Sequence, residues 1–145
     1  LGWQYADGDT ILATYGDGIG DIDLQAVLEF HRQHGKLATL CGYQPTSNFG
    51  IVEANTDGQV TTLREKPHRQ EWVNIGFFVL NRGVLNYLQN DTDDLESHVL
   101  PRLAADQQLH MYRHSGFWEK MDTIKEAQTL SKLWLSSAPW KLWEQ

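Results

Sequence analysis

The sequence is poor in cysteine, in basic residues and in long apolar runs, and each shortage excludes a class of protein. Its single cysteine, Cys41, excludes an internal disulfide and is compatible with a reducing compartment. Twelve Lys and Arg residues against nineteen Asp and Glu give a formal net charge of −7. That charge argues against non-specific nucleic-acid binding, which depends on cations that neutralise phosphates. Because no apolar run approaches the roughly 18 residues of a membrane span and no signal-peptide pattern is present, we expect a cytoplasmic protein without a membrane partner.

Predicted strands and helices alternate along the 145 residues, which favours a single α/β domain. The expected strands are residues 10–14, 37–43, 74–80 and 108–114. The expected helices are residues 21–33, 83–89, 93–105 and 123–135. The apolar run at residues 10–14 predicts a buried strand, and we expect it to pair in parallel with residues 37–43 through a right-handed crossover.

Turn and cap residues mark the boundaries of several elements. Asp21 and Asp23 are candidate caps for the first helix, because a carboxylate can accept hydrogen bonds from the first backbone N–H groups. The run Asn55-Thr56-Asp57-Gly58 separates two strand-like segments, residues 49–54 and 59–63. An Asp-Gly turn between such segments predicts a β-hairpin.

Histidines and tail tryptophans are the remaining candidates for a site or an interface. His31 and His34 share a helix face, and His110 and His114 share a strand face. No Cys/His spacing completes a tetrahedral site, so a zinc centre is not predicted. The two tryptophans within residues 136–143 need a partner surface, either within the chain or on another subunit.

Two acidic motifs far apart in the sequence are its most informative features. Tyr15-Gly16-Asp17-Gly18 follows the first predicted strand, and its glycines allow a turn that exposes Asp17 where open α/β sheets bind ligands. Asp122 stands near the end of Gly116-Phe117-Trp118-Glu119-Lys120-Met121-Asp122-Thr123. If the fold brings both acids together, they can hold a hard divalent cation while a nucleotide phosphate supplies the other ligands. The alternative is a turn Asp and a helix-capping Asp.

Six motifs follow the order and spacing of one enzyme family. They are Tyr15-Gly16-Asp17-Gly18, Phe49-Gly50, Glu65-Lys66-Pro67, residues 74–81, residues 116–123 and Ala138-Pro139-Trp140-Lys141. Through these motifs the chain resembles the sugar-1-phosphate nucleotidylyltransferases over essentially its whole length, and the last two motifs resemble the cytidylyl branch. The resemblance implies a Rossmann-like, GT-A-like mixed sheet flanked by helices and incomplete on its N-terminal side.

The resemblance also implies catalytic and binding roles. Asp17 and Asp122 match the two aspartates that bind Mg²⁺, and Lys66 matches the lysine that contacts the sugar phosphate. The further substrate-binding residues implied in this way are Tyr15, Gly50, Glu65, Asn74 and Gly76. Without the resemblance, Glu65 and Lys66 would be surface charges, Gly50 could mark a bulge, and Tyr15 could be a core aromatic.

By the same resemblance, the complete enzyme transfers CMP from CTP to glucose 1-phosphate, giving CDP-glucose and pyrophosphate. The nucleophile is already an anionic phosphate oxygen, so no general base is needed, which fits a chain without a Ser/His/Asp or Cys/His triad. The family's glycine-rich loop, G-G-x-G-T-R, is absent. We therefore expect residues 1–145 to be the C-terminal part of such an enzyme, inactive alone and prone to homo-oligomerise. Two alternatives remain open: another base or sugar, and a non-catalytic sugar-phosphate-binding or assembly module.

Overall fold

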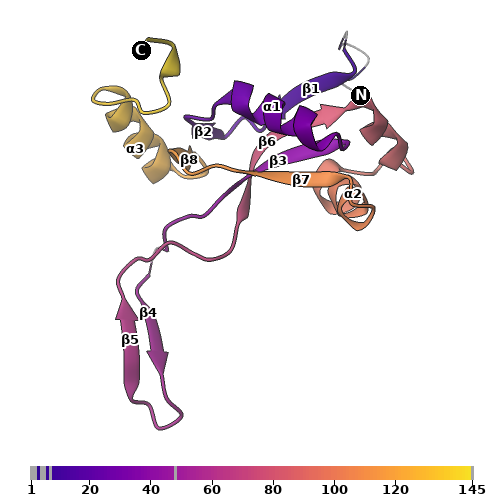
Figure 1. Ribbon diagram of the computed structural model, residues 1–145. Helices are drawn as coiled ribbons and strands as arrows, with labels where there is room; N and C mark the ends of the chain where they lie inside the picture. The colour runs from indigo at the N-terminus through magenta and orange to yellow at the C-terminus, as the bar shows by residue number, and fades with distance from the viewer. Residues whose placement is uncertain (1–2, 4–5, 7, 48, 145) are drawn as a thin grey trace.

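The structure is organised around a four-stranded mixed sheet with the strand order β1–β6–β3–β7 (Figure 1). The computed structural model describes Trp3, Ala6, residues 8–47 and residues 49–144. The four strands are β1 (Thr10–Thr14), β6 (Val73–Asn81), β3 (Ala38–Tyr43) and β7 (Leu109–Arg113). β6 is antiparallel to both of its neighbours, whereas β3 and β7 are parallel. The predicted α/β class with a mixed sheet is confirmed.

The position of β1 corrects two predictions. β1 does not pair with β3, because β6 lies between them, and Leu80 of β6 is opposite Ile11 on one side and Ala38 on the other. β1 is not a buried strand either: its residues alternate between exposed and half-buried, and Leu12 is 47% exposed. In the described part of the chain β1 pairs with β6 alone, so it forms an edge. An apolar run predicts a strand, but it does not distinguish an edge from the centre of a sheet.

Side chains on the two faces of β6 build two parts of the core. Ile75 and Val79 pack with Val27 of helix α1 (Leu24–His34) on one face. Phe78 and Leu80 belong to the cluster on the other face, which includes Leu103 of helix α2 (Leu100–Ala105). Successive residues of a strand point to opposite faces, so this nine-residue strand contributes to both clusters. Residues 78–80 are all buried, whereas Phe77 is half-buried.

Helix α1 begins after one of its two predicted caps and ends at a glycine. Asp23 is the N-cap, and its Oδ1 accepts a hydrogen bond of 3.0 Å from the Ala26 N–H. Gly35 ends the helix with φ +63°, in the left-handed region that glycine enters without steric cost. Asp21 is not the cap. Its Oδ1 instead lies 3.2 Å from Nε2 of the buried His114.

Residues 82–105 are less regular than predicted. The helix predicted at residues 83–89 is the 3₁₀ segment η2 (Arg82–Tyr87). The helix predicted at residues 93–105 is divided into a π-helical turn, η3 (Leu95–Val99), and the α-helix α2. In this turn the Leu100 N–H donates to the Leu95 carbonyl, five residues back. Pro101 follows, and because proline has no N–H it cannot continue the hydrogen-bond ladder of η3.

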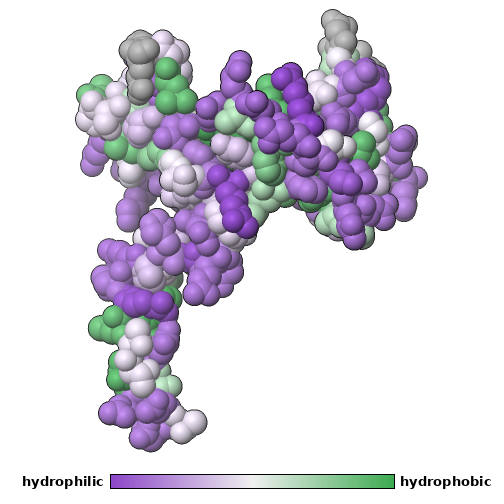
Figure 2. Space-filling view, viewed as in Figure 1, coloured by the Kyte–Doolittle hydropathy of each residue, from purple (hydrophilic) through white to green (hydrophobic). Residues whose placement is uncertain are grey.

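The predicted hairpin is confirmed and projects from the body of the molecule (Figure 1). Strands β4 (Ile51–Ala54) and β5 (Val60–Arg64) form this arm, which we define as residues 51–64. Several of its apolar side chains are exposed and appear as green patches in Figure 2; they include Val52, Val60 and Leu63. An isolated two-stranded hairpin is only marginally stable in water, so we expect the arm to be less stable than the sheet.

The C-terminal segment forms a small second layer beside the sheet. A short ladder joins β2 (Gly18–Gly20) to β8 (Trp118–Lys120), and the helix α3 (Ile124–Trp134) follows. The tail ends in the 3₁₀ turn η4 (Leu142–Glu144). Trp140 is buried against Phe117 and Trp134, whereas Trp143 is 67% exposed, so one of the two tail tryptophans finds its partner within the chain. No described helix is both long and apolar enough to cross a membrane.

Candidate functional site

The short ladder between β2 and β8 brings the two acidic motifs together. Gly18 pairs with Lys120, and the Met121 N–H donates a hydrogen bond of 2.8 Å to the Asp17 carbonyl. Asp122 therefore directly follows Met121, whose backbone is hydrogen-bonded to that of Asp17. The two motifs are more than 100 positions apart in the sequence, yet their backbones adjoin at the end of β1, as the prediction of a shared site requires.

The carboxylates of the two motifs have different surroundings. Asp17 is exposed and lines a cleft of about 530 Å³ together with Met121 and the apolar face of α3. Asp122 does not line this cleft, and its carboxylate forms an ion pair with Lys120. The bond to Asp122 raises the pKa of Lys120. Asp122 thus has a cationic neighbour, and a cation that bound both carboxylates would share Asp122 with Lys120 or compete with it.

The backbone of Asp122 is held by the start of α3. Thr123 and Glu126 form a capping box: Thr123 Oγ1 accepts from the Glu126 N–H at 3.2 Å, and Glu126 Oε2 accepts from the Thr123 N–H at 2.8 Å. The same oxygen accepts from the Asp122 N–H at 2.9 Å. Thr123 is therefore the helix cap, as predicted, and Asp122 lies just before it with its side chain outside the cap.

Carboxylate oxygens suit a hard cation such as Mg²⁺, and the exposed Asp17 has the right donor chemistry for one. Among the residues that the structure describes, no group of three or more His, Cys, Asp or Glu side chains is arranged to hold a metal ion. Within the described residues at most two carboxylates are thus grouped here, and water or phosphate oxygens would complete the coordination.

Tyr15 and Gly76 are in close contact at the ends of β1 and β6. The Tyr15 N–H donates to the Gly76 carbonyl at 3.0 Å, and the Tyr15 ring packs on Phe78 with centroids 5.5 Å apart. Gly76 has φ +76°, and a Cβ at this position would come closer than 3.0 Å to the Tyr15 ring. Glycine is thus required here both for backbone conformation and for space. Tyr15 thus packs against the core, and its role in the site stays a prediction.

Asn74 connects this pair to a residue that sequence reasoning missed. Its Oδ1 accepts from the Gly76 N–H at 3.0 Å, and its Nδ2 donates to Glu96 Oε1 at 3.2 Å. Burial, followed by the neighbouring Glu96 carboxylate, raises the pKa of Tyr15. No local pattern marks Glu96, because Asn74 is 22 residues away in the sequence and the two meet only through the fold.

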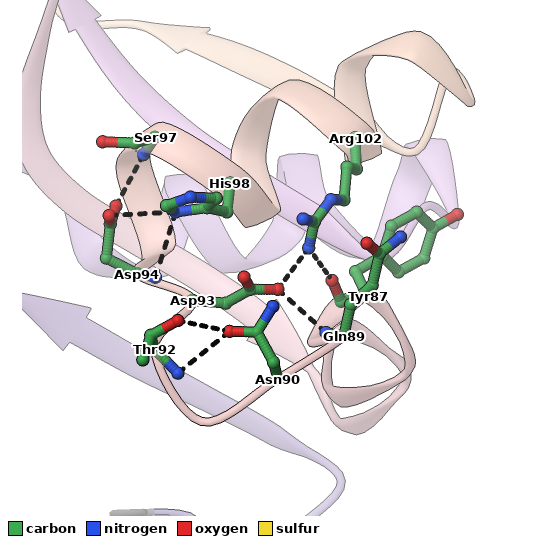
Figure 3. A network of polar contacts seen from close by, with 9 residues as sticks. All are labelled: Tyr87, Gln89, Asn90, Thr92, Asp93, Asp94, Ser97, His98 and Arg102. Atoms are coloured by element: carbon green, nitrogen blue, oxygen red, sulfur yellow. Dashed lines mark hydrogen bonds and ion pairs between the residues drawn. The ribbon is translucent and has the colours of Figure 1, made fainter.

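A network of polar contacts surrounds the π-helical turn that carries Glu96 (Figure 3). Asp93 forms an ion pair with Arg102 and accepts the Gln89 N–H at 2.8 Å. These contacts, the bond to Arg102 first, lower the pKa of Asp93 to about 2. Arg102 also donates to the Tyr87 carbonyl at 2.8 Å, so the ion pair joins η2, the loop after it and α2.

Gly50, Glu65 and Lys66 lie together at the base of the arm. A Cβ at Gly50 would lie 3.2 Å from Glu65 Oε2, which makes the two residues direct neighbours. Lys66 is exposed and has φ +43°, a conformation that costs a non-glycine residue about 1 kcal/mol or more. In the described residues Lys66 forms no ion pair, and it lines a cleft of about 640 Å³ with Glu119 and Thr123. Lys66 therefore faces the segment that contains Asp122.

Three of the histidines gather away from this site. His31 and His34 of α1 both contact Thr39 Oγ1, and the His34 ring stacks on His110 of β7 with centroids 4.3 Å apart. These three imidazoles do not form a metal-binding group in the described structure. They fasten α1 to the sheet.

The chain belongs to the nucleotidyl transferase family, whose model matches residues 3–132. It is 41% identical to the glucose-1-phosphate cytidylyltransferase of Salmonella typhimurium over 140 residues, which are 95% of this chain and 54% of that protein. It is 38% identical to the probable glucose-1-phosphate cytidylyltransferase of Bacillus subtilis over 142 residues, covering 97% of this chain and 56% of that protein. The chain thus spans about half the length of these curated relatives.

A solved structure confirms the fold. The crystal structure of HddC from Yersinia pseudotuberculosis, complexed with GMP-PN, superposes with a TM-score of 0.66 over 92% of this chain and 59% of that one. The sequence identity is 13%, so this likeness concerns the fold alone.

Proposed function

We propose that this chain provides the sugar-phosphate-binding half of an enzyme that transfers CMP from CTP to glucose 1-phosphate. An oxygen of the sugar phosphate attacks the α-phosphorus of CTP, the bond to the bridging oxygen of the β-phosphate breaks, and pyrophosphate leaves as CDP-glucose forms. The observation that carries this proposal is the 41% identity over 95% of the chain to a relative named for this activity.

Lys66 is proposed to bind the phosphate of the sugar substrate. Its backbone is held in an unfavourable conformation, which is typical of residues whose placement serves a function. Its ammonium is exposed and forms no ion pair among the described residues, so it is available to an anion. Glu65 beside it would accept hydrogen bonds from sugar hydroxyls, with Gly50 allowing the ring to approach the backbone closely.

Asn74 and Gly76 are proposed to line the sugar pocket, and Asp17 and Asp122 to bind Mg²⁺. The ion would offset negative charge at the phosphates, which a chain of net charge −7 otherwise repels. The adjoining backbones of the two acidic motifs support this assignment.

Binding of glucose 1-phosphate to this chain, measured by calorimetry, tests the proposal. We expect Lys66→Ala to weaken binding about tenfold or more, because a charge-assisted hydrogen bond contributes about 1.5–3 kcal/mol. Lys132→Ala, the same charge change on the exposed surface of α3, is the control and should have little effect. No binding by the unmodified chain would contradict the proposal.

A turnover assay separates the role of Lys66 from that of the nucleotide site. The chain alone, with CTP, Mg²⁺ and glucose 1-phosphate, is expected to make no CDP-glucose, because it lacks the loop whose N–H groups would bind the triphosphate. In a hybrid where this chain replaces the matching segment of the Salmonella protein, Lys66→Ala should raise KM for glucose 1-phosphate far more than KM for CTP. Equal losses for both substrates would indicate a structural role.

Two alternatives have distinct tests. If the substrate has another sugar, then mannose 1-phosphate, galactose 1-phosphate or a similar compound will bind the chain more tightly than glucose 1-phosphate does. The second alternative is a non-catalytic sugar-phosphate-binding or assembly module. An in-frame G-G-x-G-T-R sequence directly upstream in the DNA would support the enzyme, and a start codon in its place would support the module.

A further inference from the structure

The hydrogen bonds of Asn74 determine which way its side-chain amide faces. Oδ1 accepts from the Gly76 N–H at 3.0 Å, and Nδ2 donates to Glu96 Oε1 at 3.2 Å. A backbone N–H can only donate and a carboxylate can only accept, so a flipped amide would make two repulsive contacts. The amide nitrogen has two protons, and one is used for Glu96. The second N–H has the Tyr15 hydroxyl as a neighbour in the protein, and because Asn74 is exposed, this N–H can also donate to a ligand oxygen.

Glu96 is itself held in place by its local structure. It lies in the turn η3, where the Asp94 carboxylate accepts from the Ser97 N–H at 2.6 Å and contacts His98 Nδ1 at 3.0 Å (Figure 3). The next residues in the turn lead into the core, since Val99 is almost completely buried. π-Helical turns of this kind occur frequently at functional sites, because they place a side chain where a regular helix could not.

Charge also differs between the two ends of the candidate sugar-phosphate site. The Lys66 ammonium lies at the base of the arm, whereas the Glu96 carboxylate lies beside Asn74 at the start of β6. A sugar phosphate has a dianionic end and a hydroxyl-bearing end. Glu96 disfavours the phosphate near Asn74. By accepting one amide proton, it also fixes the direction of the second N–H, which can then donate to a hydroxyl oxygen.

We propose that Glu96 is a positioning residue that holds the Asn74 amide for a hydroxyl of the sugar phosphate. The inference rests on the proposed function, since it assigns a further specificity-determining residue to the same site. Glu96 acts through Asn74. Its removal therefore frees the Asn74 amide to rotate and weakens recognition of the sugar, but not of the phosphate.

The experiment compares Glu96→Ala, Glu96→Gln and Asn74→Ala in this chain, with Glu29→Ala on α1 as a charge-matched control. Glu96→Ala should weaken glucose 1-phosphate binding about fivefold, as expected for one hydrogen bond of about 1 kcal/mol, and leave binding of inorganic phosphate unchanged. Glu96→Gln keeps an oxygen acceptor and should restore affinity to within about twofold of the unmodified chain. Asn74→Ala should match Glu96→Ala, and the double variant should lose no more than either, because two residues that act through one contact are not additive.

An NMR readout tests the positioning without any ligand. The two side-chain amide proton signals of Asn74 should be well separated in the unmodified chain and in Glu96→Gln, and converge on those of free asparagine in Glu96→Ala. Unchanged signals in Glu96→Ala, or additive losses in the double variant, would overturn the inference. If Glu96→Ala does not fold, convergence of the Asn74 signals in a folded Glu96→Gln variant would overturn it. If the unmodified chain binds no glucose 1-phosphate, the proposed function fails, while the NMR signals still decide whether Glu96 positions Asn74.

Discussion

Mild acid is expected to destabilise this fold through His34, at the end of α1. The Lys36 N–H donates to His34 Nδ1 at 3.0 Å, and His34 Nε2 lies 2.7 Å from Thr39 Oγ1. Because Nδ1 accepts from a backbone N–H, the single proton of the neutral ring is on Nε2 and is donated to Thr39. The Thr39 hydroxyl can then donate to His31 Nδ1, 2.9 Å away. Protonation of His34 at Nδ1 would set its new N–H against that of Lys36 and break the hydrogen bond between them.

The magnitude follows from the pKa of His34. Burial, then the neighbouring His110, His31 and Lys36, lowers this pKa from 6.5 to about 4. The folded state thus favours the neutral ring, so its stabilisation is complete above pH 6.5 and is lost as the pH falls from 6.5 towards 4. If the whole shift counted, the free energy of unfolding would be about 2 kcal/mol lower at pH 5 than above pH 6.5. The ring keeps some contact with solvent, and screening reduces the expected loss to about 1 kcal/mol.

Urea unfolding followed by tryptophan fluorescence at pH 7.5 and pH 5.0 measures this loss. The comparison variant is His34→Gln, whose amide can still donate to Thr39 but does not titrate. The unmodified chain should lose about 1 kcal/mol more than His34→Gln between the two pH values. His68→Gln, at an exposed histidine near the base of the arm, is the control and should behave like the unmodified chain. Equal pH dependence in the unmodified chain and in His34→Gln would refute the reasoning.

Two further predictions concern backbone space and the open sheet edge. Gly76→Ala should lower the free energy of unfolding by about 2–4 kcal/mol, because it combines left-handed strain with a clash against Tyr15. Gly35 has a similar φ, and an added Cβ there would have no atom within 4 Å, so Gly35→Ala should lower the free energy of unfolding by only about 1 kcal/mol. Equal losses for Gly76→Ala and Gly35→Ala in urea unfolding would contradict the clash with Tyr15. The edge of β1 should cause self-association at micromolar concentration, and Leu12→Lys should reduce it, since a charge on an edge strand opposes pairing with another chain. Sedimentation of the unmodified chain as a stable monomer would be the contrary result.

Local features of the sequence were sufficient to predict most elements of this fold. Asp23 and Gly35 bound α1, and Thr123 begins α3, because caps depend on residues within one turn of the helix. The Asp57-Gly58 turn predicted the hairpin for the same reason. The phosphate contact of Lys66 comes from the family resemblance and stays a prediction, whereas its left-handed backbone is seen only in the structure. For the caps and the turn, the information lies within a few residues of the feature.

Only the tertiary structure decided which distant segments meet. An apolar strand such as β1 has the same sequence pattern at the edge of a sheet as in its centre. Its position here depends on β6, which follows about 60 residues later. The same limit explains why Glu96 was missed, because nothing near it in the sequence indicates that η3 delivers it to Asn74. The acidic motifs were predicted to meet, but the ion pair between Lys120 and Asp122 was not predicted. Periodicity, caps and motifs report on neighbours along the chain, whereas strand order and side-chain pairing depend on the packing of the whole core.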